Sequence, residues 1–198
     1  MNAKQRFIAG SAAVAVVLVA LVVYLATGSE SDDVGNPESE LSLSEATDPL
    51  DGASPELRAI RADANQLLGG GAAALQQRLD ELRGIPVVLN NWASWCGPCR
   101  AEFPMFQAQS SKLADSVAFL GVDSDDSDEA ASTFLGELPL PYPSYTDPDK
   151  ELKQEFFDSP VGIPNTAFYD RKGELVYVHQ GPYTGEAALE AEINRYAQ

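Results

Sequence analysis

The sequence predicts an α/β sandwich built around a mixed β-sheet. Short apolar runs of strand type alternate with longer segments whose apolar residues recur at helical spacing, a pattern typical of strands connected by helices. The last two apolar runs are joined instead by a four-residue turn, which indicates an antiparallel hairpin. Of the 198 residues, 44% are hydrophobic and 9% aromatic, enough apolar surface for a folded core.

The expected elements follow one another along the chain. Helices are expected over residues 58–68, 72–83, 98–113, 128–138, 150–157 and 185–196. Strands are expected over residues 86–92, 117–122, 166–169 and 174–180, with the hairpin turn at 170–173. Prolines and tyrosines between 139 and 148 indicate a stiff connection around a short additional strand. The glycines at 69–71 are interpreted as a flexible turn, since no Gly-Lys-Ser/Thr follows to complete a phosphate-binding loop.

Residues 1–28 are expected to form an N-terminal membrane anchor. Residues 7–29 carry no charge, and a helix of these 23 residues would extend about 35 Å, enough to cross a hydrocarbon core of about 30 Å. Because Lys4 and Arg6 precede the run and only acidic residues follow closely, the rest of the chain is expected outside the cytoplasm. A cleaved signal peptide is the alternative, although the apolar run is longer than a signal sequence usually contains.

Residues 29–56 are expected to form an acidic, flexible linker, and residues 57–198 the globular domain. Residues 28–56 carry nine acidic residues, no basic one and few large apolar side chains. The whole chain has a formal net charge of −17. Such a surface repels phosphate backbones and anionic lipids, so a nucleic-acid partner is not expected.

Cys96 and Cys99 are the only cysteines, and Gly97 and Pro98 separate them. They follow a predicted strand and open a predicted helix. Unpaired backbone N–H groups and the helix dipole favour a thiolate there, so the pKa of the Cys96 thiol is expected below the usual value of about 8.5. Pro98 suits a first helical turn, where its missing N–H is not needed. Cys96 would attack a disulfide, and Cys99 would resolve the mixed disulfide.

Metal and cofactor sites are not expected. A zinc site needs four ligands, whereas the chain has two cysteines and one histidine distant from them. Haem attachment needs a histidine where Arg100 stands. A purely structural disulfide is also disfavoured, because over so short a loop it would stabilise little. The acidic segment 123–129 has Asp128 where a calcium-binding loop requires glycine, so a solvated loop that caps the next helix is expected. His179 is expected to be a surface or cross-strand residue rather than a ligand or base.

The segment 87–104, VVLNNWASWCGPCRAEFP, resembles the active-site segment of the TlpA/ResA-like, membrane-anchored thioredoxin-fold oxidoreductases. Residues 162–166, Gly-Ile-Pro-Asn-Thr, followed by an apolar run, are similar to the second motif of that family. The similarity runs from about residue 65 to the C-terminus. It implies a thioredoxin-like three-layer sandwich with a mixed central sheet, preceded by one transmembrane helix and the acidic linker.

The resemblance assigns roles to individual residues. Cys96 matches the nucleophilic cysteine and Cys99 the resolving one. Pro164 matches the cis-proline beside the active-site disulfide, where the backbone of Ile163 would pair with an incoming substrate strand. The other residues expected at the substrate-binding surface are Trp95, Gly97 and Pro98.

Three polar residues near the cysteines need separate interpretation. Glu102 matches a glutamate that would tune the thiol pKa values and handle protons as Cys99 ionises. Its alternative is an ordinary first-turn carboxylate that favours the helix dipole. Asn90 stands where cytoplasmic thioredoxins have a buried aspartate. Asparagine is common at this position among TlpA-type members, and it cannot accept a proton. Asn91 replaces the large apolar residue of the relatives, and an amide in a central strand needs buried partners.

The predicted function is that of a monomeric, membrane-tethered, extracytoplasmic thiol–disulfide oxidoreductase. It would reduce disulfides in exported proteins, with a redox-active Cys96–Cys99 disulfide as its only redox group and a membrane electron donor to regenerate the thiols. The Gly-Pro pair resembles that of reducing thioredoxins, near about −270 mV, rather than that of oxidants near about −120 mV. By the resemblance, the clients include apocytochrome c during haem attachment.

Three other functions remain as alternatives. A disulfide-forming oxidant would use the same cysteines, and only the reduction potential separates it from a reductase. A peroxidase is disfavoured because the chain has no lone cysteine in a Thr-x-x-Cys setting. A thioredoxin-fold copper chaperone is disfavoured because such proteins usually place three residues between the cysteines and add a suitably placed histidine.

Overall fold

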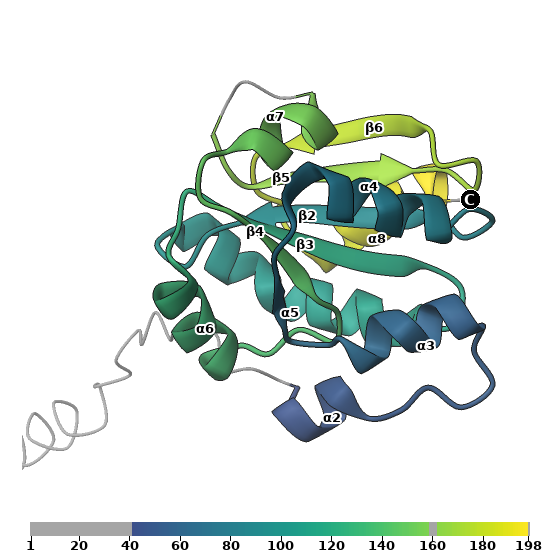
Figure 1. The fold of residues 1–198 in the computed structure, drawn as a ribbon. Helices are drawn as coiled ribbons and strands as arrows, with labels where there is room; N and C mark the ends of the chain where they lie inside the picture. The colour runs from purple at the N-terminus through teal and green to yellow at the C-terminus, as the bar shows by residue number, and fades with distance from the viewer. Residues whose placement is uncertain (1–40, 159–161, 198) are drawn as a thin grey trace, which may run out of the picture. The chain divides into compact units, whose positions relative to one another are not determined.

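A computed structural model of the chain describes residues 41–158 and 162–197. Within these residues, one six-stranded sheet has the strand order β1-β4-β3-β2-β5-β6 (Figure 1). Its strands are β1 (Leu67–Leu68), β2 (Val87–Trp92), β3 (Ala118–Ser124), β4 (Ser144–Asp147), β5 (Asn165–Tyr169) and β6 (Leu175–Gln180). The first four run parallel to one another, whereas β5 is antiparallel to both β2 and β6. The predicted mixed sheet and its additional short strand are confirmed.

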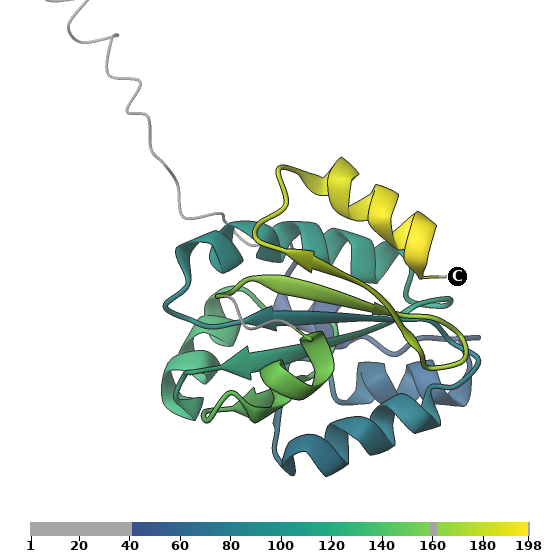
Figure 2. The ribbon, with the colours of Figure 1, turned by 90° about the horizontal axis from the view of Figure 1, so that it is seen from above.

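Helices cover both faces of this sheet. They are α2 (Leu43–Thr47), α3 (Pro55–Ala62), α4 (Gly71–Glu81), α5 (Gly97–Lys112), α6 (Asp128–Glu137), α7 (Glu151–Phe157) and α8 (Glu186–Tyr196). Figure 2 shows α5 (teal) and α8 (yellow) on one side of the sheet and α4 (blue) and α7 (green) on the other. This is the predicted three-layer α/β sandwich.

The first helix of the domain is shorter than the periodicity predicts. A helix over residues 58–68 is expected, but α3 ends at Ala62, and residues 67–68 form β1 beside β4. The chain reverses at Asn65, which adopts a left-handed conformation with φ of 60°. The Asn65 side chain donates to the carbonyl of Leu135 at 3.2 Å and accepts from the N–H of Leu140 at 2.9 Å. These distant partners stabilise a turn that local periodicity does not reveal.

The acidic segment before the domain also differs from the prediction. Within the expected linker 29–56, residues 43–47 form α2, which Ser42 and Glu45 begin with reciprocal capping hydrogen bonds. Ala46 is fully buried, and the guanidinium of the buried Arg61 donates to its carbonyl oxygen. From residue 41 onward the segment is therefore attached to α3, because one arginine of the domain satisfies its backbone carbonyls. Residues 29–40 lie outside the described residues.

The predicted membrane segment, residues 7–29, also lies outside the described residues. Among residues 41–158 and 162–197, no helix is both long and apolar enough to cross a membrane. The N-terminal anchor therefore stays a prediction from the sequence.

The carboxyl end of β2 is held by Trp92. Its side chain is fully buried and packs against Phe103 of α5 and Phe134 of α6, with ring centroids 5.2 and 5.5 Å apart. Its indole N–H donates to the hydroxyl of Ser144 at 3.0 Å. Gly121 of β3 leaves room for this contact, since a Cβ atom there would lie 2.2 Å from the Ser144 hydroxyl oxygen. The prediction that Trp92 belongs to the core is confirmed.

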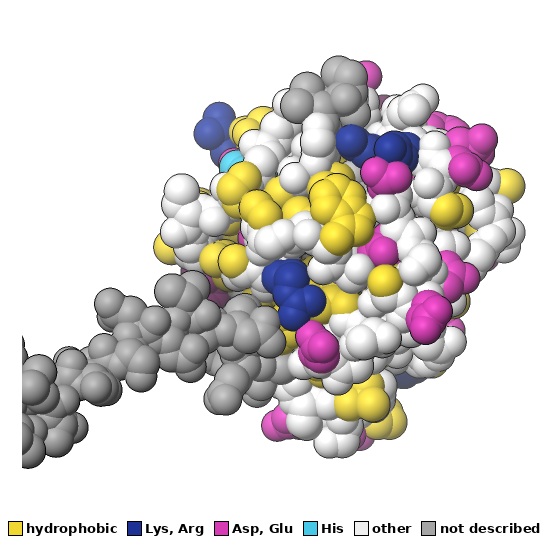
Figure 3. All heavy atoms as spheres, turned by 90° about the vertical axis from the view of Figure 1, so that its left-hand side faces the viewer, with side chains coloured by type: hydrophobic (Ala, Val, Ile, Leu, Met, Phe, Trp, Pro, Cys, Tyr) yellow, Lys and Arg dark blue, Asp and Glu magenta, His cyan; other side chains and the backbone are white. Residues whose placement is uncertain are grey.

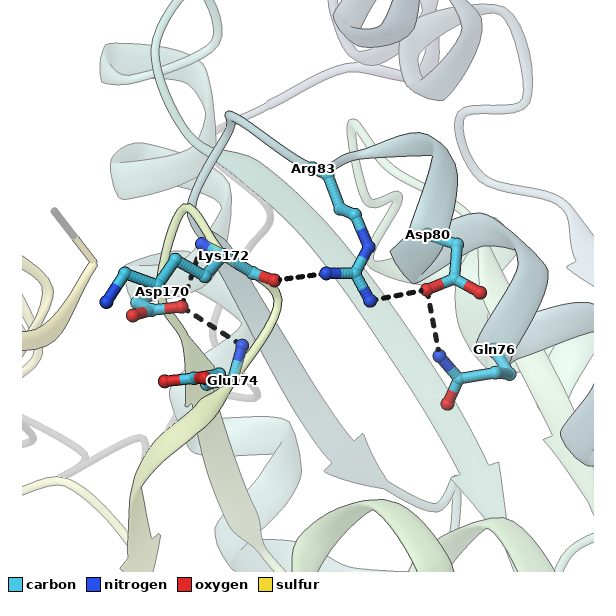
Figure 4. Close-up of polar contacts among 6 residues, drawn as sticks. All are labelled: Gln76, Asp80, Arg83, Asp170, Lys172 and Glu174. Carbon is cyan, nitrogen blue, oxygen red and sulfur yellow. Dashed lines mark hydrogen bonds and ion pairs between the residues drawn. The ribbon is translucent and has the colours of Figure 1, made fainter.

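The predicted hairpin turn joins β5 to β6 and is attached to the end of α4 (Figure 4). One carboxylate oxygen of Asp170 accepts from the N–H groups of Lys172 and Glu174 at 2.9 and 3.0 Å. Arg83 donates to the Lys172 carbonyl at 2.6 Å and contacts Asp80 at 3.1 Å. Since Tyr169 pairs with Val87 at the start of β2, these contacts secure the end of the sheet opposite the cysteines.

Candidate active site

The two cysteines occupy the amino end of α5. β2 ends at Trp92, and Cys96 is the N-cap of α5, with Pro98 in the first helical turn. Cys96 and Cys99 form a disulfide with Cα atoms 5.3 Å apart. The backbone N–H of Cys99 points at Sγ of Cys96 at 3.3 Å. In the reduced protein the same N–H group and the helix dipole would stabilise a Cys96 thiolate.

The two sulfur positions differ in accessibility. Cys96 retains 4% of its surface, whereas Cys99 has none exposed. A partner can therefore reach Cys96 first, and Cys99 can act only from inside the protein. This difference matches the nucleophilic and resolving roles that the resemblance implies.

The turn that leads into Cys96 rests on the loop between β3 and α6. The N–H of Ser94 donates to a carboxylate oxygen of Asp126 at 2.6 Å. The Trp95 indole N–H donates to the carbonyl oxygen of Asp125 at 2.9 Å, and Lys150 pairs with the Asp125 carboxylate at 2.9 Å. The Trp95 ring stays 59% exposed beside the nucleophile. It is thus held at its edge, and the rest of the ring remains open to a partner.

The burial of Asp123 contradicts the prediction that residues 123–129 form a solvated acidic loop. β3 continues to Ser124, beyond the expected end at residue 122, so Asp123 is a strand residue with 1% of its surface exposed. Burial, together with the nearby carboxylates of Asp126, Asp128 and Asp147, raises the pKa of Asp123 to about 8. Asp123 is therefore protonated at neutral pH. The expected cap of the next helix is confirmed, because Ser127 accepts from an N–H in the first turn of α6.

Glu102 lies in the second turn of α5 and faces the interior. It is 2% exposed and lies beyond the first turn, which contains no acidic residue, so the alternative of an ordinary first-turn carboxylate is wrong. One oxygen accepts the N–H of Tyr183 at 2.6 Å, while the other has no hydrogen-bond partner among the described residues. Burial raises the pKa of Glu102 to about 7, and the Tyr183 N–H partly opposes that rise. Glu102 follows Cys99 by three residues on the same helical face, so a group that exchanges protons near neutral pH lies close to the resolving cysteine.

The two asparagines of β2 lie on opposite faces of the sheet. Asn90 is 2% exposed and shares the face of Trp92, toward α5. Asn91 is fully buried on the other face. Within the described part of the chain, neither side-chain atom of Asn91 has a hydrogen-bond partner, and nothing in the structure explains its presence.

The second motif lies at the carboxyl end of β2. The peptide bond between Ile163 and Pro164 is cis, the form that the resemblance implies. The next residue, Asn165, pairs with Asn91 of β2, so the antiparallel ladder brings Pro164 to the place where the chain turns toward Cys96. The Asn165 side chain also donates to the carbonyl of Gly162 at 2.6 Å, which fixes the loop before the strand.

Figure 3 views the molecule from the end at which α6 lies, and apolar side chains gather near the middle of this face among scattered charges.

The residues expected at the substrate-binding surface differ in their exposure. Trp95, Gly97 and Pro98 are exposed, whereas Ile163 is half-buried and Pro164 is buried. A groove beside the turn that leads into Cys96 is lined by Ser94, Arg100, Ser127, Glu129, Ala130, Thr133, Phe134 and Glu137.

Two contacts at the site were missed by reasoning from the sequence. Asp126 belongs to a segment interpreted only as a solvated loop, and no motif marks its bond to Ser94. Tyr183 reaches Glu102 across 81 residues of sequence through its backbone N–H, which any residue type would supply. Only the register of β5 and β6 and the placement of α8 bring it there.

A disulfide at the amino end of a helix, placed after a central strand and beside a cis-proline, defines a thiol–disulfide oxidoreductase with a thioredoxin-like fold. The chain belongs to the Redoxin family, whose model matches residues 70–193. It is similar to the thiol–disulfide oxidoreductase ResA of Oceanobacillus iheyensis, with 27% identity over 200 residues, covering 98% of this chain and 91% of that protein. It is 30% identical to ResA of Bacillus subtilis over 107 residues, covering 54% of this chain and 59% of that protein.

Solved structures agree with this assignment. A candidate thiol:disulfide interchange protein DsbE from Chlorobium tepidum superposes with a TM-score of 0.54 at 30% identity, covering 59% of this chain and 83% of that one. A secreted thiol-disulfide isomerase from Corynebacterium glutamicum gives a TM-score of 0.51 at 27% identity, covering 57% and 71%. The predicted TlpA/ResA-like family and the thioredoxin-like fold are therefore confirmed.

Proposed function

We propose that this oxidoreductase is a membrane-tethered, extracytoplasmic reductase of disulfides in exported proteins. The observation that carries the proposal is the Cys96 sulfur at the amino end of α5, with the Cys99 N–H directed at it from 3.3 Å. That arrangement stabilises the Cys96 thiolate, which is the nucleophile that attacks a client disulfide. The direction of electron flow is supported by the Gly-Pro pair between the cysteines, which resembles that of reducing thioredoxins near about −270 mV.

The reaction proceeds in two exchanges. The Cys96 thiolate attacks one sulfur of the client disulfide, forms a mixed disulfide and releases the first client thiolate. Cys99 then loses its proton and attacks Sγ of Cys96, which releases the second client thiolate. The client gains two electrons, and the protein ends with the Cys96–Cys99 disulfide. Glu102, with a pKa of about 7, accepts the proton of Cys99 in the second exchange.

The client would bind over the exposed side of the disulfide. The Trp95 ring offers a fixed apolar surface, and Gly97 and Pro98 leave the approach to Cys96 free of large side chains. By the family resemblance, the backbone of Ile163 pairs with an extended client strand ahead of Pro164.

The proposed location rests on the uncharged run at residues 7–29, whose flanking charges predict an N-terminal anchor with the domain outside the cytoplasm. Similarity to a secreted thiol-disulfide isomerase supports an extracytoplasmic domain. A membrane electron donor would return the site to the dithiol form. The proposed clients are exported proteins with disulfides, including apocytochrome c, and the protein acts as a monomer without a further cofactor.

The reduction potential of the Cys96–Cys99 pair tests the direction of the reaction. The full chain in detergent would be equilibrated with thiol–disulfide buffers, and the thiols would be trapped and counted by mass spectrometry. A potential below about −220 mV supports the reductase. A potential above about −150 mV would make the protein an oxidant of exported proteins instead.

A further inference from the structure

The carboxylate of Glu102 depends on a single described hydrogen bond. The donor is the N–H of Tyr183, at 2.6 Å, in the segment that connects β6 to α8. The second carboxylate oxygen is buried and has no partner among the described residues. Because a hydrogen bond to the charged form stabilises it, the position of this N–H controls how readily Glu102 ionises.

The side chain of Tyr183 fixes the position of that N–H. Tyr183 is 6% exposed, and its hydroxyl donates to a carboxylate oxygen of Glu192 in α8 at 2.7 Å. Its ring stacks on the His179 ring of β6, with centroids 4.0 Å apart and planes 15° apart. It also packs in an edge-to-face arrangement with the Phe106 ring of α5, with ring centroids 6.4 Å apart. The segment before α8 is thus held by contacts with β6, α8 and α5.

Glu192 and His179 complete a path from the surface to Glu102. The second carboxylate oxygen of Glu192 lies 3.1 Å from Nδ1 of His179, and each side chain is 22% exposed. Glu192 therefore contacts both the Tyr183 hydroxyl and the His179 ring. The backbone N–H of Tyr183 connects this pair of contacts to the buried carboxylate of Glu102. Other titratable groups near these carboxylates are Tyr142 at Glu102 and Tyr177 at Glu192, and Tyr196 and Arg195 lie near Tyr177.

Other contacts hold α8 without touching this path. Gln109 of α5 donates to Glu186 at 2.7 Å, and Lys112 of α5 pairs with Glu190. Both contacts attach α8 to α5 through residues that have no bond to Tyr183. A substitution at one of these residues weakens the attachment of α8 but removes no contact of Tyr183. It can therefore serve as a control for substitutions that alter the position of the Tyr183 N–H.

We propose that Tyr183, Glu192 and His179 are positioning residues that hold the Tyr183 N–H against Glu102 and so govern proton transfer from Cys99. None of them touches the reacting sulfurs, and each acts through Glu102. This inference rests on the proposed function, because it concerns the proton released in the second thiol exchange. It adds a surface site, the Glu192–His179 pair, through which the surroundings of α8 influence the buried carboxylate.

The first test measures Glu102 directly in the oxidised protein, where neither cysteine titrates. The full chain in detergent, with carbon-13-labelled glutamate, would be titrated by NMR, and Glu102→Gln would identify the resonance. In Tyr183→Phe the N–H loses its anchor, so the titration midpoint should rise by about 0.5 pH units or more. Glu192→Ala should shift the midpoint in the same direction. Glu190→Gln, which removes only the contact with Lys112, should leave it unchanged.

The second test uses activity. The reduced protein would react with oxidised glutathione between pH 5 and 9, and the pH midpoint of the resolving step should rise in Tyr183→Phe. Combined with Glu102→Gln, the tyrosine substitution should have no further effect on the profile. An unchanged NMR midpoint in both Tyr183→Phe and Glu192→Ala, or a shift equally large in Glu190→Gln, overturns the proposal. A wild-type protein inert toward glutathione would refute the proposed function instead, and the NMR midpoint would still decide the positioning role.

Discussion

The backbone N–H of Ser94 donates to the carboxylate of Asp126 at 2.6 Å. This bond joins the turn that leads into Cys96 to the loop that follows β3, and the indole of Trp95 binds the same loop one residue away. Two connections that leave neighbouring parallel strands therefore form one support for the nucleophile. The support predicts which side chains outside the Cys-x-x-Cys segment affect the reaction.

Replacing Asp126 with alanine should loosen this support. Ser94 loses its acceptor and the buried Asp123 loses a polar neighbour, so we expect a loss of about 1–3 kcal/mol in the free energy of unfolding. Urea denaturation at neutral pH measures this, and the rate of glutathione disulfide reduction should fall as well. Asp115→Ala, at an exposed position between α5 and β3, is the matched control. Equal unfolding midpoints for the two variants would show that the Ser94 bond contributes nothing.

The two cysteines should fail in different ways. Cys99→Ser keeps the accessible nucleophile but cannot resolve, so it should accumulate a mixed disulfide with a client or with glutathione. Cys96→Ser should form none, because Cys99 has no exposed surface. Non-reducing electrophoresis and intact mass measurement separate these outcomes. Equal trapping by both variants would contradict the assignment of Cys96 as the nucleophile.

Glu102→Gln should remove the pH dependence of the resolving step near neutrality. The amide cannot accept the Cys99 proton, so we expect this step to slow about tenfold or more at pH 7. Stopped-flow kinetics of the mixed disulfide, from pH 5 to 9, provide the measurement. Glu190→Gln on α8 makes the same chemical change but keeps Glu102, so it serves as the control. If the rate of the resolving step in Glu102→Gln still changes with pH near 7, a group other than Glu102 accepts the Cys99 proton.

The stability of the protein should fall as the pH rises. The pKa of Asp123 rises from an ordinary value near 3.8 to about 8, and that of Glu102 from 4.5 to about 7. The folded state then binds these protons more tightly than the unfolded state, so their contribution is complete below about pH 4 and is lost on passing through pH 7 and 8.

For Asp123 alone we expect a decrease of about 2 kcal/mol or more in the free energy of unfolding between pH 5 and 8. Asp123→Asn mimics the protonated carboxyl and should remove that part of the slope. Urea denaturation of both proteins at several pH values tests it. A slope unchanged by the substitution would mean that Asp123 is ionised in the folded protein.

Gly121→Ala should be strongly unfavourable. The new methyl group would lie 2.2 Å from the Ser144 hydroxyl oxygen and 2.9 Å from the Trp92 indole nitrogen, so both side chains must move. We expect a loss of about 1–3 kcal/mol in unfolding free energy. Gly136→Ala, in α6 with open space around it, should instead gain about 0.5–1 kcal/mol. Thermal unfolding of the pair gives the comparison, and equal transition temperatures would argue against crowding at β3.

Local patterns in the sequence determined most of the fold and the centre of the site. Helix and strand periodicities depend on neighbouring residues, so the elements from residue 71 onward lie within a few residues of their predicted positions. The strand followed by Cys-Gly-Pro-Cys and a helix likewise specifies the redox chemistry, because the two sulfurs and the helix end are adjacent in the chain. The prediction failed at Leu67–Leu68, where a strand depends on pairing with β4, and at α2, whose attachment depends on Arg61.

Only the tertiary structure decided how the site handles protons and what supports it. The burial of Glu102 depends on which face of α5 meets the sheet, and its partner Tyr183 arrives from 81 residues away. Asp126 reaches Ser94 because β2 and β3 are paired in parallel, which brings their carboxyl ends to one edge. A pKa depends on desolvation and on nearby charges, and both are set by groups distant in sequence. The cysteines could therefore be found from the chain alone, whereas the environment of their proton acceptor could not.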